Sequence, residues 1–361
     1  MNSVYLRVKF GKFDFPNHSS RSKGLFFVSL LFVFVLLFSS LVFMLNADDG
    51  VSPFVFGAHD VTVGDEATLR NAVNNAVGPT VIALTADISL TGSPLNVPSG
   101  KDITLTSDGD TVGFFKLFGV AYQSTIFVEG GGLLKLEGVV VTHARDAYGS
   151  GVTVDSMGTL LMFGGEIFNN TATWGGGVYI DAKGSFVMSG GKIYNNTVGG
   201  VVSYGDFSMF GGEIYNNIGI NGGGVFTSGT FSMFSGEIYN NIADCGGGVY
   251  NNMLSSFVMS GGKIYNNTVI YGFGGGVDNE DRSSFVMSGG VIYNNTAWAG
   301  GGVSVFFGKF TMFDGTICNN TATGANGGGV YFYDGTDFGM SGGVIHNNTA
   351  ANNGGGGVLL F

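Results

Sequence analysis

Carboxylates recur at one position of a repeated segment, where they could serve acid–base chemistry. Glu213 and Glu237 occupy this position in successive copies, and Glu166, Lys192 and Lys263 occupy it in neighbouring copies. Cleavage of a glycosidic bond needs two carboxyl groups about 5–9 Å apart. Because lysines interrupt the glutamates, we interpret these five residues, the charged column, as ion-paired surface side chains rather than as a catalytic pair.

The most polar segment of the chain is Asp278-Asn-Glu-Asp-Arg282. Its carboxylates could hold Ca²⁺, and its arginine could act as a base. A hard cation needs about six or more oxygen ligands, however. The corresponding segments of the adjacent copies contain Asn251-Asn252 and Phe306-Phe307 instead of acids. We therefore predict no catalytic site and no metal site here.

Histidines and cysteines offer no further catalytic or metal-binding arrangement. The four histidines are His18, His59, His143 and His346. They are isolated from one another, so we predict neither a metal cluster nor a catalytic triad, and no cofactor. Cys245 and Cys318 lie three copies apart, about 14 Å at the strand spacing, whereas a disulfide needs Cα atoms within about 7 Å. We expect both thiols to be free.

A column of aromatic side chains is our candidate for ligand binding. The tyrosine stripe, as we call it, consists of Tyr194, Tyr215, Tyr239, Tyr265 and Tyr293. Phe168 precedes the stripe at the same repeat position, and Cys318 and His346 follow it. Such rings could stack on the faces of sugars or on a partner's side chains. The alternative is a structural role, in which the rings stack on one another.

A pair of asparagines follows almost every copy of this aromatic position. With Ile193 facing inward and Tyr194 outward, we expect Asn195 to point inward and Asn196 to lie at the turn. A column of inward asparagines can form hydrogen bonds from one copy to the next. The alternative is glycosylation, because six of the pairs begin an Asn-Asn-Thr sequon. The pair persists where isoleucine replaces the threonine, at Ile218 and Ile242, which favours the hydrogen-bonded column.

The charged column, the tyrosine stripe and the asparagine pairs belong to an eleven-residue block, of which residues 186–196, FVMSGGKIYNN, are one copy. Phe186 and Met188 alternate with smaller residues, which predicts a strand with one buried face. Gly-Gly then permits a sharp bend, Ile193 begins a second strand, and a recurrent GGGV begins a third. Stacked coils would align like residues about 4.8 Å apart. We therefore expect a parallel β-helix with inward columns of phenylalanine, methionine and isoleucine.

The solenoid should span residues 64–361 and begin with a capping helix at residues 65–77. Asp65 is a suitable N-cap and Gly78-Pro79 ends the helical pattern. Strand-like segments then lead into the regular repeats, at Val81–Leu84, Ile103–Leu105 and Thr125–Val128. At the other end the chain stops within a repeat. An uncovered coil there favours a longer chain, with pairing to a partner as the alternative.

The N-terminal residues have a different character. Residues 1–23 carry five basic side chains and one acid, residues 24–45 carry no charge, and residues 46–63 form a linker. An apolar run of this length spans a bilayer, with the basic flank in the cytoplasm. We expect a membrane signal-anchor, with a long cleaved signal peptide as the alternative. From Asn46 onward there are 10 basic and 25 acidic residues, a balance that excludes nucleic-acid binding.

The motif GGGVY…F-x-M-x-GG-x-IYNNTA resembles the surface-displayed, pectin-lyase-like repeats of bacterial and archaeal adhesin-like proteins. It is also similar to the GGAI/FxxN repeats of polymorphic outer-membrane proteins. The resemblance implies an all-β, right-handed, single-stranded parallel β-helix, a handedness that agrees with the crossover rule for parallel strands. It further implies a protein at the cell surface, or secreted, that binds glycans or other surfaces without catalysis.

Two other functions are compatible with such a scaffold. The first is a polysaccharide lyase or glycoside hydrolase, with its site at Asp278–Arg282 or in the less regular coils around Lys101–Arg145. The second is a structural spacer in the cell envelope. A monotonous repeat is more typical of an adhesin than of an enzyme, and we therefore favour a non-catalytic binding protein.

Overall fold

The computed structural model describes residues 59–108, 113–143, 148–173, 175–324, 326–333, 337–351 and 355–360. The basic segment 1–23, the apolar segment 24–45 and the linker up to residue 58 lie outside this part of the chain. Among the described residues, no helix is long and apolar enough to cross a membrane. The membrane segment therefore stays a prediction.

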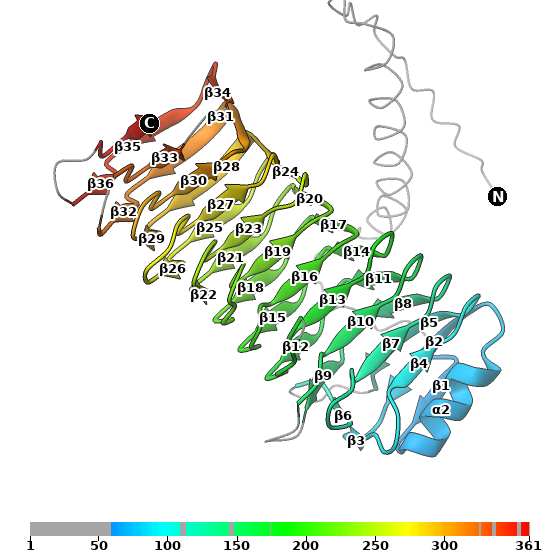
Figure 1. Cartoon of the computed structure of the whole chain (residues 1–361). Helices are drawn as coiled ribbons and strands as arrows, with labels where there is room; N and C mark the ends of the chain where they lie inside the picture. The colour runs from blue at the N-terminus through cyan, green and yellow to red at the C-terminus, as the bar shows by residue number, and fades with distance from the viewer. Residues whose placement is uncertain are drawn as a thin grey trace, which may run out of the picture. The chain divides into compact units, whose positions relative to one another are not determined.

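The described chain folds as a parallel β-solenoid, which confirms the all-β fold class predicted from the repeats. Its strands form sheets of 21, 11 and five strands. Strands of successive coils pair in parallel, and equivalent repeat positions face one another. Figure 1 shows the strands following one another along the stack from the helix α2 (Glu66–Asn75). We call each coil level a rung.

The 21-stranded sheet contains two stacks of strands. The first stack is formed by the Phe-x-Met segments and by the less regular strands that precede them. In chain order its separate strands are β1 (Val61–Val63), β2 (Pro79–Leu84), β5 (Asp102–Ser107), β8 (Leu133–Leu136), β11 (Thr159–Met162), β14 (Ser185–Met188), β17 (Asp206–Met209), β20 (Thr230–Met233), β24 (Ser256–Met259) and β34 (Asp337–Met340).

The second stack contains the strands that lead into the asparagine pairs. In chain order they are β3 (Ile88–Ser89), β6 (Lys116–Gly119), β9 (Val140–His143), β12 (Glu166–Phe168), β15 (Lys192–Tyr194), β18 (Glu213–Tyr215), β21 (Glu237–Tyr239), β25 (Lys263–Tyr265) and β35 (Val344–His346). Two long strands, β28 (Ser284–Tyr293) and β31 (Lys309–Cys318), run through both stacks. They join the two stacks into one sheet.

The GGGV segments form the 11-stranded sheet. Its strands are β4 (Leu95–Val97), β7 (Ile126–Val128), β10 (Val152–Val154), β13 (Val178–Ile180), β16 (Val201–Ser203), β19 (Val225–Thr227), β23 (Val249–Asn251), β27 (Val277–Glu280), β30 (Val303–Phe306), β33 (Val330–Tyr333) and β37 (Val358–Leu360). The five-stranded sheet follows the asparagine pairs and contains β22 (Ile242–Ala243), β26 (Thr268–Val269), β29 (Thr296–Ala297), β32 (Thr321–Ala322) and β36 (Thr349–Ala350).

The core consists of the predicted columns of identical side chains. The Phe186 and Phe207 rings lie 4.8 Å apart at an interplanar angle of 7°, and Phe231 continues the stack at 4.7 Å. The methionine and isoleucine columns beside them, including Met209 and Ile214, are fully buried. Burying each such side chain contributes about 1.5–3 kcal/mol. The inward columns therefore supply the main stabilisation of a fold that is only one coil wide.

The Gly-Gly bend between the two stacks has a steric reason. The second glycine of the pair has a positive φ, for example 86° in Gly212, which disfavours any residue with a Cβ atom. A Cβ atom on Gly212 would also lie 2.5 Å from Cε of Met188 and 2.9 Å from the carbonyl oxygen of Gly191. Glycine is thus required by both conformation and space.

Helix α2 covers the first coil, as predicted. The carboxylate of Asp65 accepts a hydrogen bond from the amide of Thr68 at 2.9 Å and caps the helix. Leu69 and Val73 are buried against the core. The helix ends at Asn75, two residues earlier than predicted, and Val77 is exposed.

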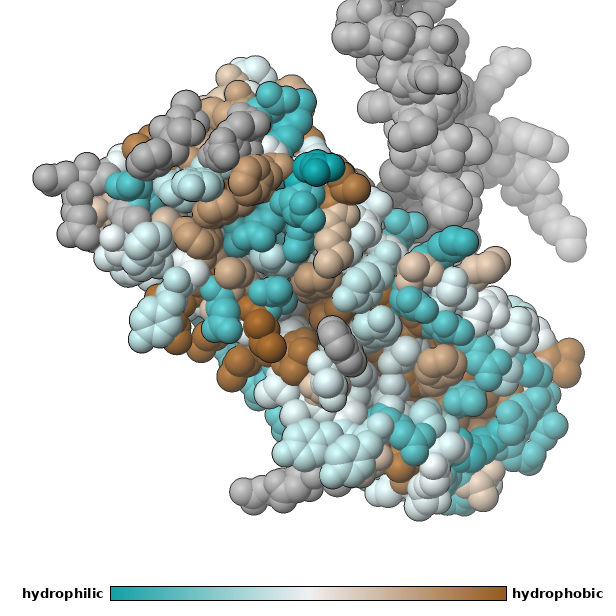
Figure 2. Space-filling view, in the orientation of Figure 1, coloured by the Kyte–Doolittle hydropathy of each residue, from teal (hydrophilic) through white to brown (hydrophobic). Residues whose placement is uncertain are grey.

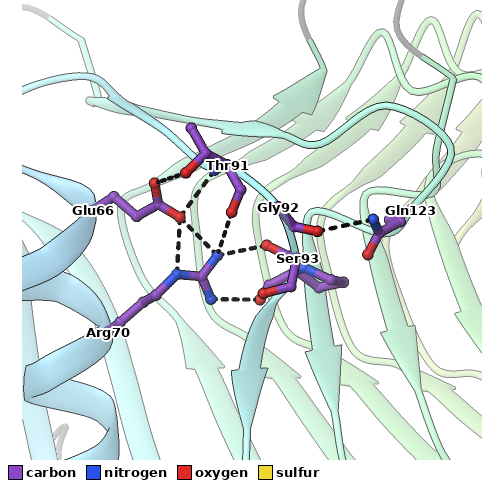
Figure 3. Close-up of polar contacts among 7 residues, drawn as sticks. Glu66, Arg70, Thr91, Gly92, Ser93 and Gln123 are labelled. Carbon is purple, nitrogen blue, oxygen red and sulfur yellow. Dashed lines mark hydrogen bonds and ion pairs between the residues drawn. The ribbon is translucent and has the colours of Figure 1, made fainter.

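Polar contacts hold α2 to the loop after β3 (Figure 3). The Glu66 carboxylate accepts hydrogen bonds from the amide and hydroxyl of Thr91, at 2.9 and 2.7 Å. The Arg70 guanidinium donates to Glu66 and to the carbonyl oxygens of Ser93 and Pro94. Because these contacts fix the orientation of α2, its apolar face stays over the core.

Candidate functional site

A buried column of asparagines runs along the solenoid, but it uses the second residue of each pair rather than the first. The amide nitrogen Nδ2 of Asn196 donates to Oδ1 of Asn217 at 3.0 Å, and Asn217 makes the same contact with Asn241. The asparagine ladder consists of Asn170, Asn196, Asn217, Asn241, Asn267, Asn295, Asn320 and Asn348. The prediction that Asn195 points inward and Asn196 lies at the turn was wrong.

The first asparagine of each pair turns the chain and explains this reversal. Asn195 has a φ of 54° and is exposed, and Asn216 and Asn240 share this conformation and exposure. Asparagine tolerates the left-handed region better than most residues. Since that conformation breaks the in–out alternation of the preceding strand, the next side chain faces the core.

His143 occupies the ladder position at the irregular N-terminal end. One ring nitrogen, Nδ1, lies 2.8 Å from Oδ1 of Asn170, and Nε2 lies 2.9 Å from the carbonyl oxygen of Gln123. The side chain is buried. His143 is therefore a structural end to the ladder. Lys101 begins the segment Lys101–Arg145, which was the candidate region for an enzymatic site. Its side chain donates to the carbonyl oxygens of Asn74 and Ala76 at the C-terminal end of α2.

The tyrosine stripe forms a continuous stack of rings on the outer surface. Neighbouring centroids from Phe168 to Tyr293 lie 4.8–4.9 Å apart, with interplanar angles of 4–9°. The rings therefore stack on one another, which is the arrangement that the structural alternative predicted. Within the stack each ring faces its neighbours, so a ligand would meet ring edges and hydroxyl groups rather than open ring faces.

The charged column lies beside the stripe, and each of its three glutamates accepts a hydrogen bond from a tyrosine hydroxyl. Tyr194 donates to Glu166 at 2.8 Å, and Tyr265 donates to Glu237 at 2.8 Å. In each case the tyrosine binds the glutamate of the preceding rung. Of the column's predicted ion pairs, the described structure contains Lys263 with Glu237, at 2.9 Å. The prediction of an ion-paired column therefore holds only at this rung.

This arrangement keeps the tyrosine hydroxyls protonated. Burial, followed by the hydrogen bond to Glu166 and its negative charge, raises the pKa of Tyr194 well above its ordinary value. The same causes, with Glu213 and Glu237 as the acceptors, raise the pKa of Tyr239 and Tyr265. For Tyr215, burial and the nearby Glu213 charge raise the pKa. This part of the outer surface thus presents neutral tyrosine hydroxyls beside the carboxylates and lysines of the charged column.

A shallow groove of about 530 Å³ runs along the Gly-Gly bends next to this array. Its lining includes Gly211–Glu213, Ser235–Glu237 and Lys263. The glycine-rich floor exposes backbone atoms. Phe210 and Phe234, which directly precede these segments, stack on each other at 4.5 Å. The groove and the middle of the tyrosine stripe together form the candidate functional site.

The polar segment Asp278–Arg282 is only partly an exposed turn, formed by Asp281 and Arg282. Asp278 and Asn279 belong to strand β27 and are fully buried. The preceding loop packs on Asp278, so closely that a Cβ atom on Gly274 would lie 2.5 Å from the Asp278 Cβ. Among the described residues, neither carboxylate oxygen of Asp278 has a hydrogen-bond partner. Burial and then the Glu280 charge raise its pKa well above the ordinary value.

Neither cysteine is in a disulfide in the described structure, as expected. Burial raises the pKa of the Cys245 thiol to about 11. Within the described residues, no three His, Cys, Asp or Glu side chains lie together in a way that could hold a metal ion.

No protein-family model matches this chain, and no curated protein and no solved structure matches it either. The fold therefore defines the class, a parallel β-solenoid of short repeats. The likeness to adhesin-like repeats rests on the motif residues alone.

Proposed function

We propose that the solenoid is displayed outside a cell and binds a glycan chain along the groove and the tyrosine stripe, without cleaving it. The observation that carries this proposal is the regular outer column of tyrosine rings, which repeat every 4.8–4.9 Å beside the glutamates and lysines of the charged column. A polymer of repeating sugars presents hydroxyls at regular intervals too. A rigid array can contact several units of such a chain at once.

The polar groups suit the hydroxyl groups of a sugar. Glu213 and Glu237 accept hydrogen bonds from the tyrosine hydroxyls and still have free acceptor capacity, because a carboxylate has about four acceptor positions. Each bound tyrosine oxygen can in turn accept a hydrogen bond. The groove floor of glycines permits close approach of a ligand to the backbone.

The groove also suits an extended ligand better than a small one. It runs across several rungs, from Gly211 to Val291, and it is open rather than enclosed. Small-molecule sites are concave and bury most of their ligand. The aromatic pair Phe210 and Phe234 offers apolar surface beside the polar tyrosine and glutamate groups. A sugar chain also has both apolar faces and polar hydroxyl groups, so it could contact both kinds of surface.

The first experiment incubates the full chain with acidic and neutral polysaccharides in the presence of Ca²⁺. We expect retention of the protein on at least one polysaccharide and no release of reducing or unsaturated ends. Release of such ends would replace this proposal with the enzymatic alternative. No retention on any surface polymer would favour a structural spacer.

The second experiment locates the site. The triple variant Tyr215→Ser, Tyr239→Ser and Tyr265→Ser should weaken binding by about tenfold or more, because central aromatic residues dominate interface energies. A matched control replaces Tyr179, Tyr204 and Phe226 by serine. Tyr179 and Phe226 lie on the 11-stranded sheet and Tyr204 directly follows β16, and the ring centroids of Tyr179 and Phe226 lie 5.8 and 5.7 Å from that of Tyr204. Equal loss of binding in both variants, or none in the first, would contradict the site.

A further inference from the structure

We propose that the exposed asparagine of each Asn-Asn-Thr sequon carries an N-linked glycan, and that two rungs without sequons leave an uncovered window at one end of the groove. The six acceptors are Asn169, Asn195, Asn266, Asn294, Asn319 and Asn347. The inference rests on the proposed extracellular display and refines the proposed binding site.

The structure separates the two roles of the asparagine pair. The second asparagine is buried in the ladder, where Asn196 donates to Asn217 and to the carbonyl oxygen of Ile167. The first asparagine is exposed at a corner of the coil, as in Asn195 and Asn266. The hydrogen-bonded column and glycosylation are therefore compatible, because they use different residues. N-linked glycans occur on exposed asparagines of such sequons in secreted proteins.

The threonine of the sequon has no structural requirement for its hydroxyl group. Thr197 pairs with Ile218, which pairs with Ile242, so threonine and isoleucine occupy one column of rungs. Both residues are β-branched and suit a strand. The Thr197 hydroxyl oxygen is buried and has no hydrogen-bond partner among the described residues, so the folded structure gains no hydrogen bond from it. A threonine that the fold does not need at this position is explained by recognition of the sequon.

The modification itself is a transfer of a sugar to the amide nitrogen. A separate transferase brings a phosphate-activated sugar donor to the acceptor. The Nδ2 atom of Asn266, for example, forms a bond to the anomeric carbon, and the bond from that carbon to the phosphate oxygen breaks. The phosphate leaves with the electron pair, and the amide loses one proton. Because adjacent acceptors are only about 4.8 Å apart, glycans on neighbouring rungs compete for space, and we expect partial occupancy.

The two rungs that lack a sequon form half of the candidate functional site, because the groove also extends over the rungs of Lys263 and Val291, which carry the sequons at Asn266 and Asn294. Asn216 and Asn240 are followed by Ile218 and Ile242. Their rungs carry Tyr215 and Tyr239, which directly precede these asparagines. The same two rungs contribute Glu213 and Glu237 to the groove. Acceptors on both sides, at Asn195 and Asn266, would place glycans beside this window and leave it open.

The window also exposes apolar side chains. Ile218, Ile220 and Ile242 are 54%, 65% and 41% exposed. Figure 2 shows hydrophobic surface around β22, which contains Ile242. Exposed apolar surface of this kind marks sites of interaction, and a glycan on either rung would cover it.

The test begins with the full chain isolated from the cells that produce it. Peptide mass mapping with fragmentation should find sugar on the first asparagine of the sequons and none on Asn216 or Asn240. Six unmodified acceptors would overturn the inference, while the proposed function would still be tested independently by the tyrosine variants.

Two variants then exchange the residues that distinguish the rungs. Thr268→Ile should abolish modification of Asn266 without lowering the melting temperature, since isoleucine already occupies this column. Ile242→Thr creates a sequon at Asn240 and should add a glycan there. Binding of a polysaccharide that retains the wild-type chain should then fall by about tenfold or more. The control Ile242→Val should retain binding. A glycan on Asn240 with unchanged binding, or an unmodified Asn240 beside modified natural acceptors, would overturn the window.

Discussion

The hydroxyl of Tyr239 donates a hydrogen bond to Glu213 of the preceding rung, and the two oxygen atoms lie 2.6 Å apart. The contact crosses one rung, so it ties neighbouring coils together on the outside of the sheet. Tyr265 repeats it with Glu237. Tyr215 has Lys192 rather than a glutamate in the preceding rung, and no such bond forms there. The identity of one charged residue thus decides the contact of the tyrosine in the next rung.

This relationship predicts alkaline destabilisation. The folded pKa of Tyr194, Tyr239 and Tyr265 is raised, chiefly by burial, from a value of 10.0. Below pH 10 both states keep the proton and the stabilisation is fully present. Above pH 10 the unfolded tyrosines lose protons that the folded ones retain, so the free energy of unfolding falls as the pH rises.

Thermal melts of the full chain between pH 8 and pH 12 should show this decline, with tyrosinate absorbance appearing together with unfolding. Tyr239→Phe removes one of these groups and should make the decline less steep. Complete ionisation of Tyr194, Tyr239 and Tyr265 near pH 10 in the folded protein would contradict the prediction.

The asparagine ladder predicts opposite roles for adjacent residues. Asn217→Ala removes the acceptor of the Asn196 backbone amide and one of the two acceptors of the Asn196 side chain, together with the hydrogen bond to the carbonyl oxygen of Ile193. We expect the free energy of unfolding to fall by about 1–3 kcal/mol, the cost of leaving buried polar groups unpaired. Asn216→Gly should have a much smaller effect, because glycine adopts the positive φ of 54° readily. Urea unfolding measures both. A larger loss in Asn216→Gly would contradict the ladder.

Shortening a side chain of the phenylalanine column should leave a cavity in the core and lower the free energy of unfolding substantially. Phe231 is fully buried and stacks on Phe207 and Phe257, at 4.7 Å on each side. Phe231→Ala should lower the free energy of unfolding by about 3–5 kcal/mol. Phe234→Ala, three residues further along but exposed, is the matched control and should cost less. Comparable urea midpoints for the two variants would argue against the column as the main source of stability.

The buried carboxyl group of Asp278 should make the free energy of unfolding depend on pH in the acidic and neutral range. Burial raises its folded pKa well above 3.8. Below pH 3.8 the Asp278 carboxyl group is protonated in both the folded and the unfolded state, and its contribution to stability is fully present. As the pH rises towards the folded pKa, the unfolded state loses this proton while the folded state keeps it, so the contribution is lost. Asp278→Asn removes this titration. Melting temperatures of the variant should exceed those of the wild type by more at pH 7 than at pH 4, and a constant difference would refute the assignment.

The thiol of Cys245 should react slowly with alkylating reagents at neutral pH. Burial raises its thiol pKa to about 11, so little thiolate forms at neutral pH. In a Cys318→Ser background, alkylation of Cys245 should be slow at pH 8 and should accelerate towards pH 11. Mass spectrometry follows the reaction. Rapid alkylation at pH 8 in the folded protein would show that the thiol is not protected.

Much of the fold can be predicted from the sequence, because the same residue pattern recurs in every copy of the repeat. Alternation of Phe186 and Met188 with small residues indicates a buried strand face, and the constant block length aligns each copy with the next. These features predict the parallel register, the inward columns and free cysteines. The capping helix follows from Asp65 and the apolar spacing after it. All of these inferences rest on local periodicity, which is visible in one dimension.

Other features depend on contacts between rungs and on single backbone conformations. Alternation predicts side-chain direction only while the chain stays extended, so it fails at Asn195, whose positive φ turns Asn196 into the core. The partner of Tyr239 depends on which residue the previous rung supplies. The sequence suggests that Asp278 is an exposed acid, but the loop at Gly274 covers it. The sequence alone determined the solenoid and its columns. The tertiary structure decided which atoms remain outside to meet a ligand, because that depends on how each turn packs on its neighbours.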